Sequence, residues 1–294
     1  VAWLVGRNDT LVTVFVLTSF IFFIKYINEK KFFFLILHLI FYLFAILSKE
    51  VSLSLPFLLV LFYFLAGNKK ILSRQIIPAA AGWLILITLW YLMRSAAFED
   101  AWCKTSVKPE YFITNIATIP EFISKFFLPV NLSVLPVFKP LHTIAGIVLA
   151  GGMTAAYFLI KNKRKNLIVF GIVWFLLFTV PGMFSRIFIA DRWNEYLECR
   201  TYLPLAGLLI ACAGFFPAKL MSFKNKSAVI ILVVITMLFA VLSWFEAGYY
   251  RDPETFFASA ADDNPNRSRI RYHYALTLKD AGKLDKAEEQ LIRS

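Results

Sequence analysis

Apolar runs alternate with short polar segments over the first 250 residues, and the rest of the chain is polar. The runs are about 16–20 residues long, which is the length that crosses the hydrocarbon core of a bilayer as an α-helix. We therefore expect an all-α, polytopic membrane bundle in residues 1–250. Its eight expected spans cover residues 11–25, 32–47, 51–66, 76–93, 143–160, 167–184, 203–218 and 228–245.

The connectors between the runs are alternately basic and mixed in sign. One set is basic, with Glu29 as its only acid; it holds Lys25, Lys30, Lys31, Lys69, Lys70, Arg74, Lys161, Lys163, Arg164, Lys165, Lys219, Lys224 and Lys226. The other set mixes cations and carboxylates. Cytoplasmic loops of membrane proteins are enriched in lysine and arginine, so the basic set predicts the cytoplasmic side. Both ends of the chain are then extracytoplasmic.

The long connector between the fourth and fifth runs contains a helical pattern within 111–127. Ile113, Ile116 and Ile123 recur near the helical period, whereas Glu121 and Ser124 fall elsewhere. The pattern predicts a helix that lies in the outer membrane interface. A helix packed on the bundle as part of its core is the alternative.

Residues 251–294 form a second, extracytoplasmic region with a different pattern. Two short helices are expected, with small residues at Ala275 and Ala287 and a turn at 281–283. This spacing matches one tetratricopeptide unit. One such unit cannot bury its own apolar face, so we expect further repeats after Ser294.

Composition excludes several classes of protein. The chain is 59% hydrophobic, and its net charge of +12 lies in the connectors, so the charge is explained by the membrane rather than by a nucleic acid. The sequence shows neither the His and Cys spacing of a zinc site nor a phosphate-binding glycine loop. We therefore expect no metal and no cofactor held by the protein. The chain begins at Val1 without Met, without a charged n-region and without a visible signal peptide, so we expect a piece of a longer protein.

Ionisable residues at span ends are candidate functional residues, because they are costly to hold near a membrane. Three groups lie on the expected outer side: Arg7 with Asp9, Lys49 with Glu50, and a charged segment within 190–204. That segment, called the collar below, carries Asp191, Arg192, Glu195, Glu198 and Arg200. If it is helical, its three acids share one stripe and its two arginines the next. Cations of this kind bind phosphate, and a carboxylate can take a proton from a hydroxyl.

Each group also has a purely structural interpretation. Lys49 and Glu50 can be a pair whose lysine reaches out to the headgroups, and Asp9 can cap the first helix. The collar can be a solvated connector. His38 lies alone in the middle of a run, which favours a hydrogen-bonded structural histidine.

Two further expectations concern small side chains. Gly151 and Gly152 predict a site of close helix packing. Cys103 and Cys199 could form an extracytoplasmic disulfide, although unpaired thiols are favoured for them and for Cys212.

Five motifs follow one another in a recognisable order. They are Val1-Ala-Trp-Leu-Val-Gly-Arg-Asn-Asp9, Ser48-Lys49-Glu50, the segment 119–136, Glu198-Cys-Arg-Thr-Tyr-Leu-Pro204 and the expected helical hairpin. Together they resemble the bacterial relatives of the transmembrane and tetratricopeptide-repeat O-mannosyltransferase family, within the GT-C glycosyltransferase superfamily. The resemblance covers nearly the whole chain and implies a bacterial inner-membrane protein that lacks its N-terminal spans. The family more often has His at Cys199 and an aliphatic residue at Thr201.

The resemblance implies that a sugar is transferred from a polyprenyl-phosphate donor to a hydroxyl of an acceptor protein. It places the main catalytic base upstream of Val1. The implied ligands of the donor phosphate are Arg200, Lys49, Arg7, Arg192 and Tyr202. Asp9, Glu50 and Glu195 are second-tier acids or bases. The expected partners are the lipid bilayer, the lipid-linked sugar and an acceptor protein bound by the repeats.

Two other functions remain open from the sequence. One is a non-catalytic membrane anchor that displays a repeat scaffold for assembling envelope proteins. The other is a transporter of lipid-linked sugars. A transporter calls for ionisable residues near mid-bilayer, and His38 is almost the only candidate.

Overall fold

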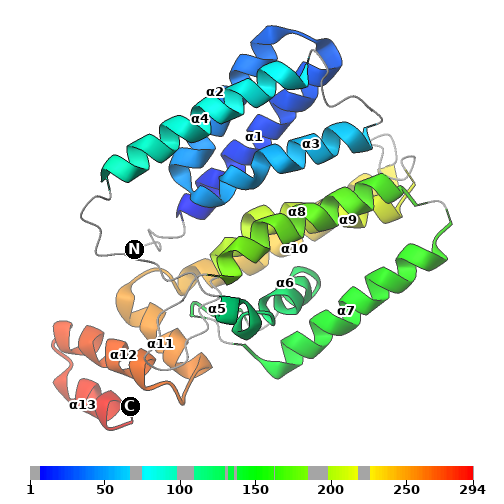
Figure 1. Cartoon of the computed structure of the whole chain (residues 1–294). Helices are drawn as coiled ribbons and strands as arrows, with labels where there is room; N and C mark the ends of the chain where they lie inside the picture. The colour runs from blue at the N-terminus through cyan, green and yellow to red at the C-terminus, as the bar shows by residue number, and fades with distance from the viewer. Residues whose placement is uncertain are drawn as a thin grey trace.

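The computed structural model describes residues 7–66, 75–97, 109–129, 132–135, 138–161, 163–184, 198–217 and 226–293. Within these ranges every regular element is helical, and no strand occurs (Figure 1). The predicted all-α class is therefore confirmed for the described residues.

A helix occupies each of the expected apolar runs. The bounds are Arg7–Glu29 for α1, Phe32–Ser48 for α2, Glu50–Ser54 for the 3₁₀ helix η2, Leu55–Leu65 for α3, Ile76–Ala97 for α4, Pro140–Leu159 for α7, Lys165–Met183 for α8, Tyr202–Phe215 for α9 and Lys226–Gly248 for α10. Among the described residues, α1, α4, α7, α8 and α10 are long and apolar enough to cross a membrane, whereas α2, η2 with α3, and α9 are shorter. The chain is thus an integral membrane protein by the length and composition of these helices.

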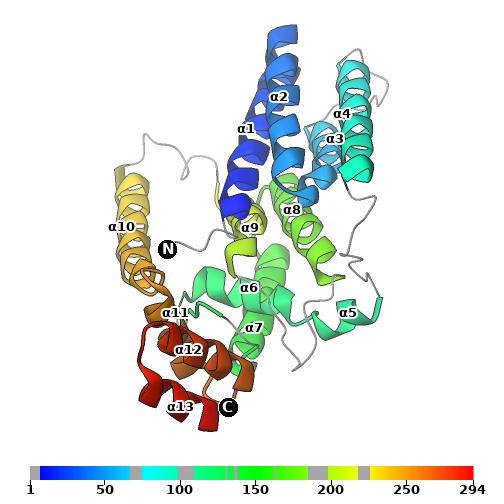
Figure 2. The same cartoon turned by 90° about the vertical axis from the view of Figure 1, so that its left-hand side faces the viewer.

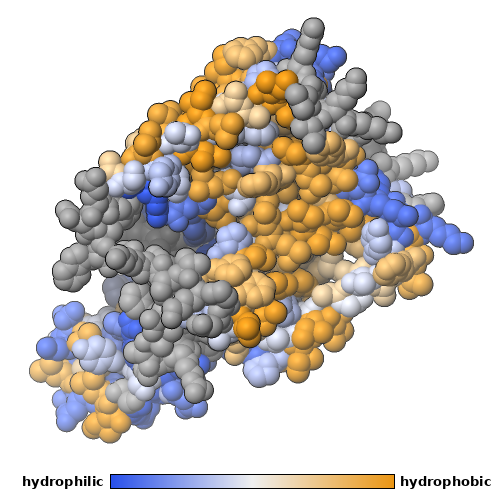
Figure 3. All heavy atoms as spheres, in the orientation of Figure 1, coloured by the Kyte–Doolittle hydropathy of each residue, from blue (hydrophilic) through white to orange (hydrophobic). Residues whose placement is uncertain are grey.

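The helix ends gather in two zones (Figures 1 and 2). In Figure 1 the beginnings of α1, α7 and α9 and the ends of α2, α4 and α8 lie at the left-hand, lower end of each slanting helix, a zone called the ion-pair end below. The opposite zone, called the basic end, contains the α1–α2 turn at Lys30 and the α7–α8 connector. In Figure 3 the lateral surface between the zones is largely hydrophobic, and hydrophilic spheres gather at its right-hand edge.

Glycine lets α8 and α9 approach closely. A Cβ added at Gly171 would lie 2.4 Å from the backbone nitrogen of Ala211, and one at Gly207 would lie 2.6 Å from the carbonyl oxygen of Gly171. The predicted packing role of Gly151 and Gly152 is wrong, because no atom lies within 4 Å of a Cβ at either position. Both glycines are exposed on α7. The glycine of α7 that does allow a close approach is Gly146, where an added Cβ would collide with the backbone of Pro120 in α6.

The expected single helix over 111–127 is two helices. They are α5, Pro109–Thr114, and α6, Thr118–Phe127, separated by a turn at 115–117. Ile113 of the first is 72% exposed, while Glu121 and Ser124 of the second are fully buried. α6 packs on α7 and also contacts α9. For α6 the alternative of a helix packed on the bundle is therefore the correct one.

The polar C-terminal region forms three helices: α11 is Pro253–Asp263, α12 is Ser268–Asp280 and α13 is Leu284–Ile292. The predicted turn is present between α12 and α13, where Gly282 has a φ of 76° that favours glycine. Ala275 and Ala287 are buried between the two helices, with Leu278. The helical hairpin is thus confirmed, and its assignment as a tetratricopeptide unit stays a prediction.

The hairpin region is attached to the bundle by the chain between α6 and α7. Val134 and Leu135 pack in one apolar cluster with Phe256, Ala260 and Ile270. The side-chain amide of Asn264 donates to the carbonyl oxygen of Leu135 at 3.1 Å. α11 and α12 therefore rest against the same connector that carries α6.

Candidate functional site

Asp9 and Lys49 form an ion pair at the ion-pair end. Asp9 lies in the first turn of α1, and the ammonium group of Lys49 comes from the junction of α2 and η2. Asp9 is only 8% exposed, so its carboxylate needs this partner. The interpretation of Asp9 as a helix cap is wrong, because Asp9 is inside α1. Its negative charge in the first turn still suits the helix dipole.

A second ion pair lies at the same end and joins Glu50 of η2 to Arg94 of α4. Their side chains are 55% and 42% exposed, so water weakens the attraction. The guanidinium of Arg94 also lies 5.2 Å from the centre of the Trp90 ring. Lys49 and Glu50 are therefore each paired with a different helix, and the interpretation of the two as a pair with each other is wrong.

Arg200 reaches the same end from a third part of the chain. It lies in the 3₁₀ helix η3, Glu198–Thr201, which packs against α1 and leads into α9. Arg200 is half-buried, Tyr202 is exposed, and Arg7 is exposed in the first turn of α1. The structure thus brings the elements of Arg7, Asp9, Lys49 and Arg200 to one end of the bundle.

The rest of the predicted collar lies outside the described residues. This applies to Asp191, Arg192 and Glu195, and the side chains of Glu198 and Cys199 are likewise not described. Cys103 also lies outside them, so the disulfide with Cys199 stays untested. Cys212, within α9, is a free thiol.

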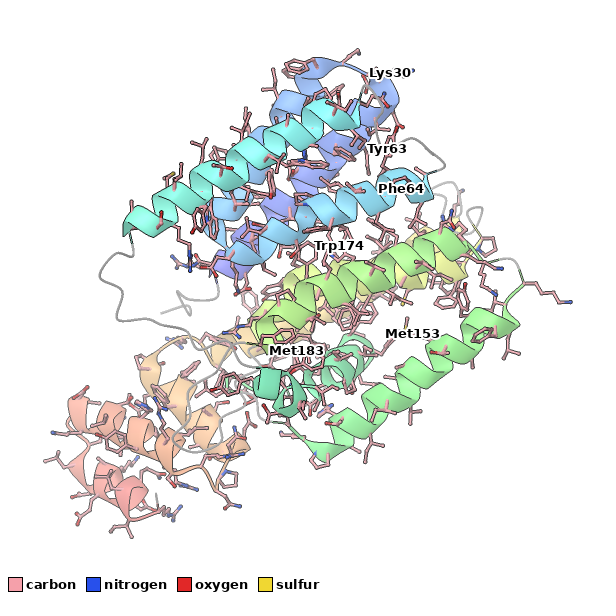
Figure 4. The ribbon with its side chains drawn as sticks, viewed as in Figure 1. Lys30, Tyr63, Phe64, Met153, Trp174 and Met183 are labelled. Atoms are coloured by element: carbon pink, nitrogen blue, oxygen red, sulfur yellow. The ribbon has the colours of Figure 1, made fainter. Side chains whose placement is uncertain are left out.

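His38 belongs to a closed network in the core. The indole N–H of Trp83 donates to Nε2 of His38 at 2.7 Å, so the proton of the neutral ring is on Nδ1. Nδ1 faces the backbone oxygen of Ser19 at 3.0 Å, and the Ser19 hydroxyl donates to the His38 carbonyl at 3.0 Å. Both ring nitrogens are satisfied and buried. Trp174 of α8, labelled in Figure 4, faces α1 and α3 in the neighbouring part of this core. The prediction of a structural histidine is confirmed.

Glu121 is a buried carboxylate that the sequence pattern assigned to a polar face. It accepts the backbone N–H of Lys139 at 2.8 Å and the hydroxyl of Thr143 at 2.9 Å. These donors belong to the first turn of α7, whose dipole also favours a negative charge there. Glu121 therefore fixes α6 to the beginning of α7. One feature of the sequence could have indicated this contact. Pro140 marks the beginning of a helix, and the first backbone N–H groups of a helix need an acceptor from outside the helix.

An apolar groove of about 360 Å³ runs between α6, α7, α8 and α9. Ile123, Met153 and Phe175 are among its lining residues, and Met153 is labelled in Figure 4. Such a groove on a membrane bundle suits a hydrocarbon chain rather than a polar ligand.

No group of three or more His, Cys, Asp and Glu side chains that could hold a metal occurs in the part of the chain that the structure describes. No protein-family model, no curated protein and no solved structure matches this chain.

Proposed function

We propose that the chain supplies about eight spans of a larger membrane glycosyltransferase, which transfers a sugar from a polyprenyl-phosphate donor to a protein hydroxyl on the extracytoplasmic face. One observation carries the proposal: charged residues from α1, the α2–η2 junction and η3 lie at a single end of the bundle. The resemblance of the motifs around these residues gives the reaction class. The alternation of basic and mixed connectors supports this end as the outer one.

In this proposal the phosphate of the donor binds Arg200, with Arg7 and Tyr202 beside it. Arginine suits this role because its planar guanidinium donates two parallel hydrogen bonds to a phosphate. As the bond to the sugar breaks, the arginine stabilises the charge that develops on the leaving phosphate. Lys49 contributes positive potential while it remains paired with Asp9.

The main base lies upstream of Val1 in this proposal. Asp9 and Glu50 then act as positioning groups, because each already has a cationic partner. The helical hairpin α12–α13 is the beginning of a tetratricopeptide array that binds the acceptor protein. Asn264 holds this array near the donor site through Leu135.

The test is sugar transfer in membranes that contain the full protein, a polyprenyl-phosphate sugar and an acceptor protein. Arg200→Ala is expected to lower the rate about 10²–10³-fold, the usual loss when one group that stabilises transition-state charge is removed. Lys31→Ala, which changes an exposed cation at the basic end, is the control and keeps the rate. Equal rates for both variants would contradict the proposal.

A second candidate function is a non-catalytic scaffold for envelope assembly. It is favoured by the pairing of Asp9 with Lys49 and of Glu50 with Arg94, which leaves neither carboxylate without a partner. A scaffold depends on the placement of its hairpin. Asn264→Ala would then impair assembly while Arg200→Ala would not, whereas sugar transfer requires Arg200.

A further inference from the structure

The apolar groove is open toward the lipid and ends at the basic end of the bundle. Its lining comes from α6, α7, α8 and α9, and Thr154 and Tyr157 are the only polar side chains among the described residues that line it. The hydroxyl of Thr154 is already bonded to the carbonyl oxygen of Ala150 at 2.9 Å. Apart from the hydroxyl of Tyr157, the groove therefore offers hydrocarbon contacts along its length.

The length of the groove fits one leaflet of a bilayer. On α7 the lining runs from Ala150 to Phe158, and on α8 from Ile168 to Leu176. At a rise of 1.5 Å per residue each stretch is about 12 Å long. A leaflet contributes about half of the 30 Å hydrocarbon core. An acyl chain that enters the groove from one membrane surface is thus covered over most of its depth.

Four cationic residues lie in the α7–α8 connector, where the groove ends; this end is called its mouth below. The connector after Phe158 and before Ile168 contains Lys161, Lys163, Arg164 and Lys165. Lys163 lies over the ring of Tyr157, with 4.8 Å between Nζ and the ring centre. Arg164 is bonded to the end of α9, where its backbone N–H donates to the carbonyl oxygen of Gly214 at 2.8 Å. The connector therefore joins the ends of α7, α8 and α9, three of the four helices that line the groove.

Carboxylates are absent from the helices around this mouth. The sequence has no acidic residue between Glu121 and Asp191, and none between Glu198 and Glu246. α7, α8 and α9 consequently carry no negative charge that could neutralise the connector. The exposed side chains of Lys161 and Lys165 therefore create a positive potential that attracts anions.

We propose that this groove and connector bind one anionic glycerophospholipid at the basic end. One acyl chain lies in the groove, and the phosphate of the headgroup contacts Lys161, Lys163 and Lys165. Basic pockets between membrane helices recognise anionic headgroups in this way. The site lies at the opposite end of the bundle from Arg200 and does not depend on the proposed sugar transfer.

The test measures binding of phosphatidylglycerol and phosphatidylcholine to the purified full chain by competition at equilibrium. The unaltered protein is expected to prefer phosphatidylglycerol. Replacing the three lysines together, K161Q, K163Q and K165Q, is expected to lower that preference about 100-fold, since each lysine near a membrane surface contributes about fivefold. The matched control K30Q with K31Q removes cations from the same end, away from the groove, and keeps the preference.

A second variant tests the groove itself. Ala150→Phe fills its lining and is expected to weaken both lipids equally, without changing the preference between them. Water-soluble glycerol phosphate is expected not to compete, because it has no chain for the groove. The proposal is overturned if the unaltered protein shows no preference, if the lysine variant keeps it, if Ala150→Phe binds both lipids normally, or if glycerol phosphate competes as well as the lipid. An unchanged unfolding midpoint shows that each variant is folded.

Discussion

α8 and α10 are both apolar enough to cross a membrane, but α8 is partly buried inside the protein and α10 is exposed. Both are long and apolar, yet 44% of the most apolar window of α8 is buried inside the protein and none of that of α10. α8 carries Gly171 at its contact with α9, whereas α10 has a run of large side chains from Val229 to Phe239. Lipid is as apolar as a leucine side chain, so hydrophobicity does not bring membrane helices together. Membrane helices associate where small residues allow their backbones to approach closely.

The largest expected effect comes from blocking the close contact. Gly171→Leu would place atoms where the backbone of Ala211 and Gly207 already lies, so α8 and α9 must separate. Overpacking costs about 1–3 kcal/mol where side chains can move aside. Here the obstacle is backbone, so we expect a loss above about 5 kcal/mol, in the range reserved for exceptional substitutions. Tryptophan fluorescence during unfolding in mild detergent measures it, since Trp174 donates to the carbonyl oxygen of Leu203 across this contact at 2.8 Å. The control Gly151→Leu, on the open face of α7, should unfold like the unaltered protein; equal losses would show that the contact is not special.

Truncating one leucine in each environment sharpens the comparison. Leu208 of α9 is 2% exposed and Leu232 of α10 is 54% exposed. Leu208→Ala is expected to cost about 2–5 kcal/mol because it leaves a cavity. Leu232→Ala should change the free energy of unfolding by less than about 0.5 kcal/mol. Unfolding in one lipid mixture measures both, and a large loss for Leu232→Ala would mean that α10 packs on protein.

The two ion pairs extend the comparison to charges. Asp9→Asn removes the partner of Lys49 from a buried position and is expected to cost about 1–3 kcal/mol. Glu50→Gln breaks the exposed pair with Arg94 and should cost about 0–1 kcal/mol. Raising the salt concentration should reduce only the second effect. If the order of the two variants were reversed, burial would not be what sets their cost.

The smallest effect is expected at the beginning of α11. The pKa of Asp252 lies below its ordinary value because its carboxylate accepts the backbone N–H of Thr255 at 2.8 Å and its hydroxyl at 2.9 Å. The stability that this cap contributes is present above the ordinary pKa of about 4 and is lost as the pH falls through the lowered value. The protection of the Thr255 amide, measured as its hydrogen exchange relative to an unstructured amide at the same pH, should fall in that range. In Asp252→Ala the exchange should already be fast at neutral pH, and a slow exchange there would contradict the role of the cap.

The positions of the helices were predictable because run length and hydropathy are local properties of the chain. The turn at Gly282 was predictable for the same reason. The burial of Glu121 was not, since its partners Lys139 and Thr143 lie 18 and 22 residues away. The break between α5 and α6 goes with that burial: Ile113 of α5 is exposed, whereas Glu121 of α6 is buried against α7.

The candidate site was predictable only as a set of charged positions. The sequence placed Asp9 and Lys49 at span ends on one side, but their pairing joins residues that are 40 positions apart. It also suggested that Lys49 is available for a phosphate, whereas the structure gives its ammonium group to Asp9. Pairing of this kind depends on how helices pack, and a hydropathy pattern carries no information on it.

The bond from Asn264 to Leu135 has a mechanical consequence. α10 precedes the polar helices along the chain, yet α11 and α12 are held by the segment between α6 and α7. A load applied to the hairpin therefore reaches the bundle by two routes: through the chain into α10, and through this contact into the connector between α6 and α7. The polar region is therefore fixed to the bundle at two points, the end of α10 and the connector between α6 and α7.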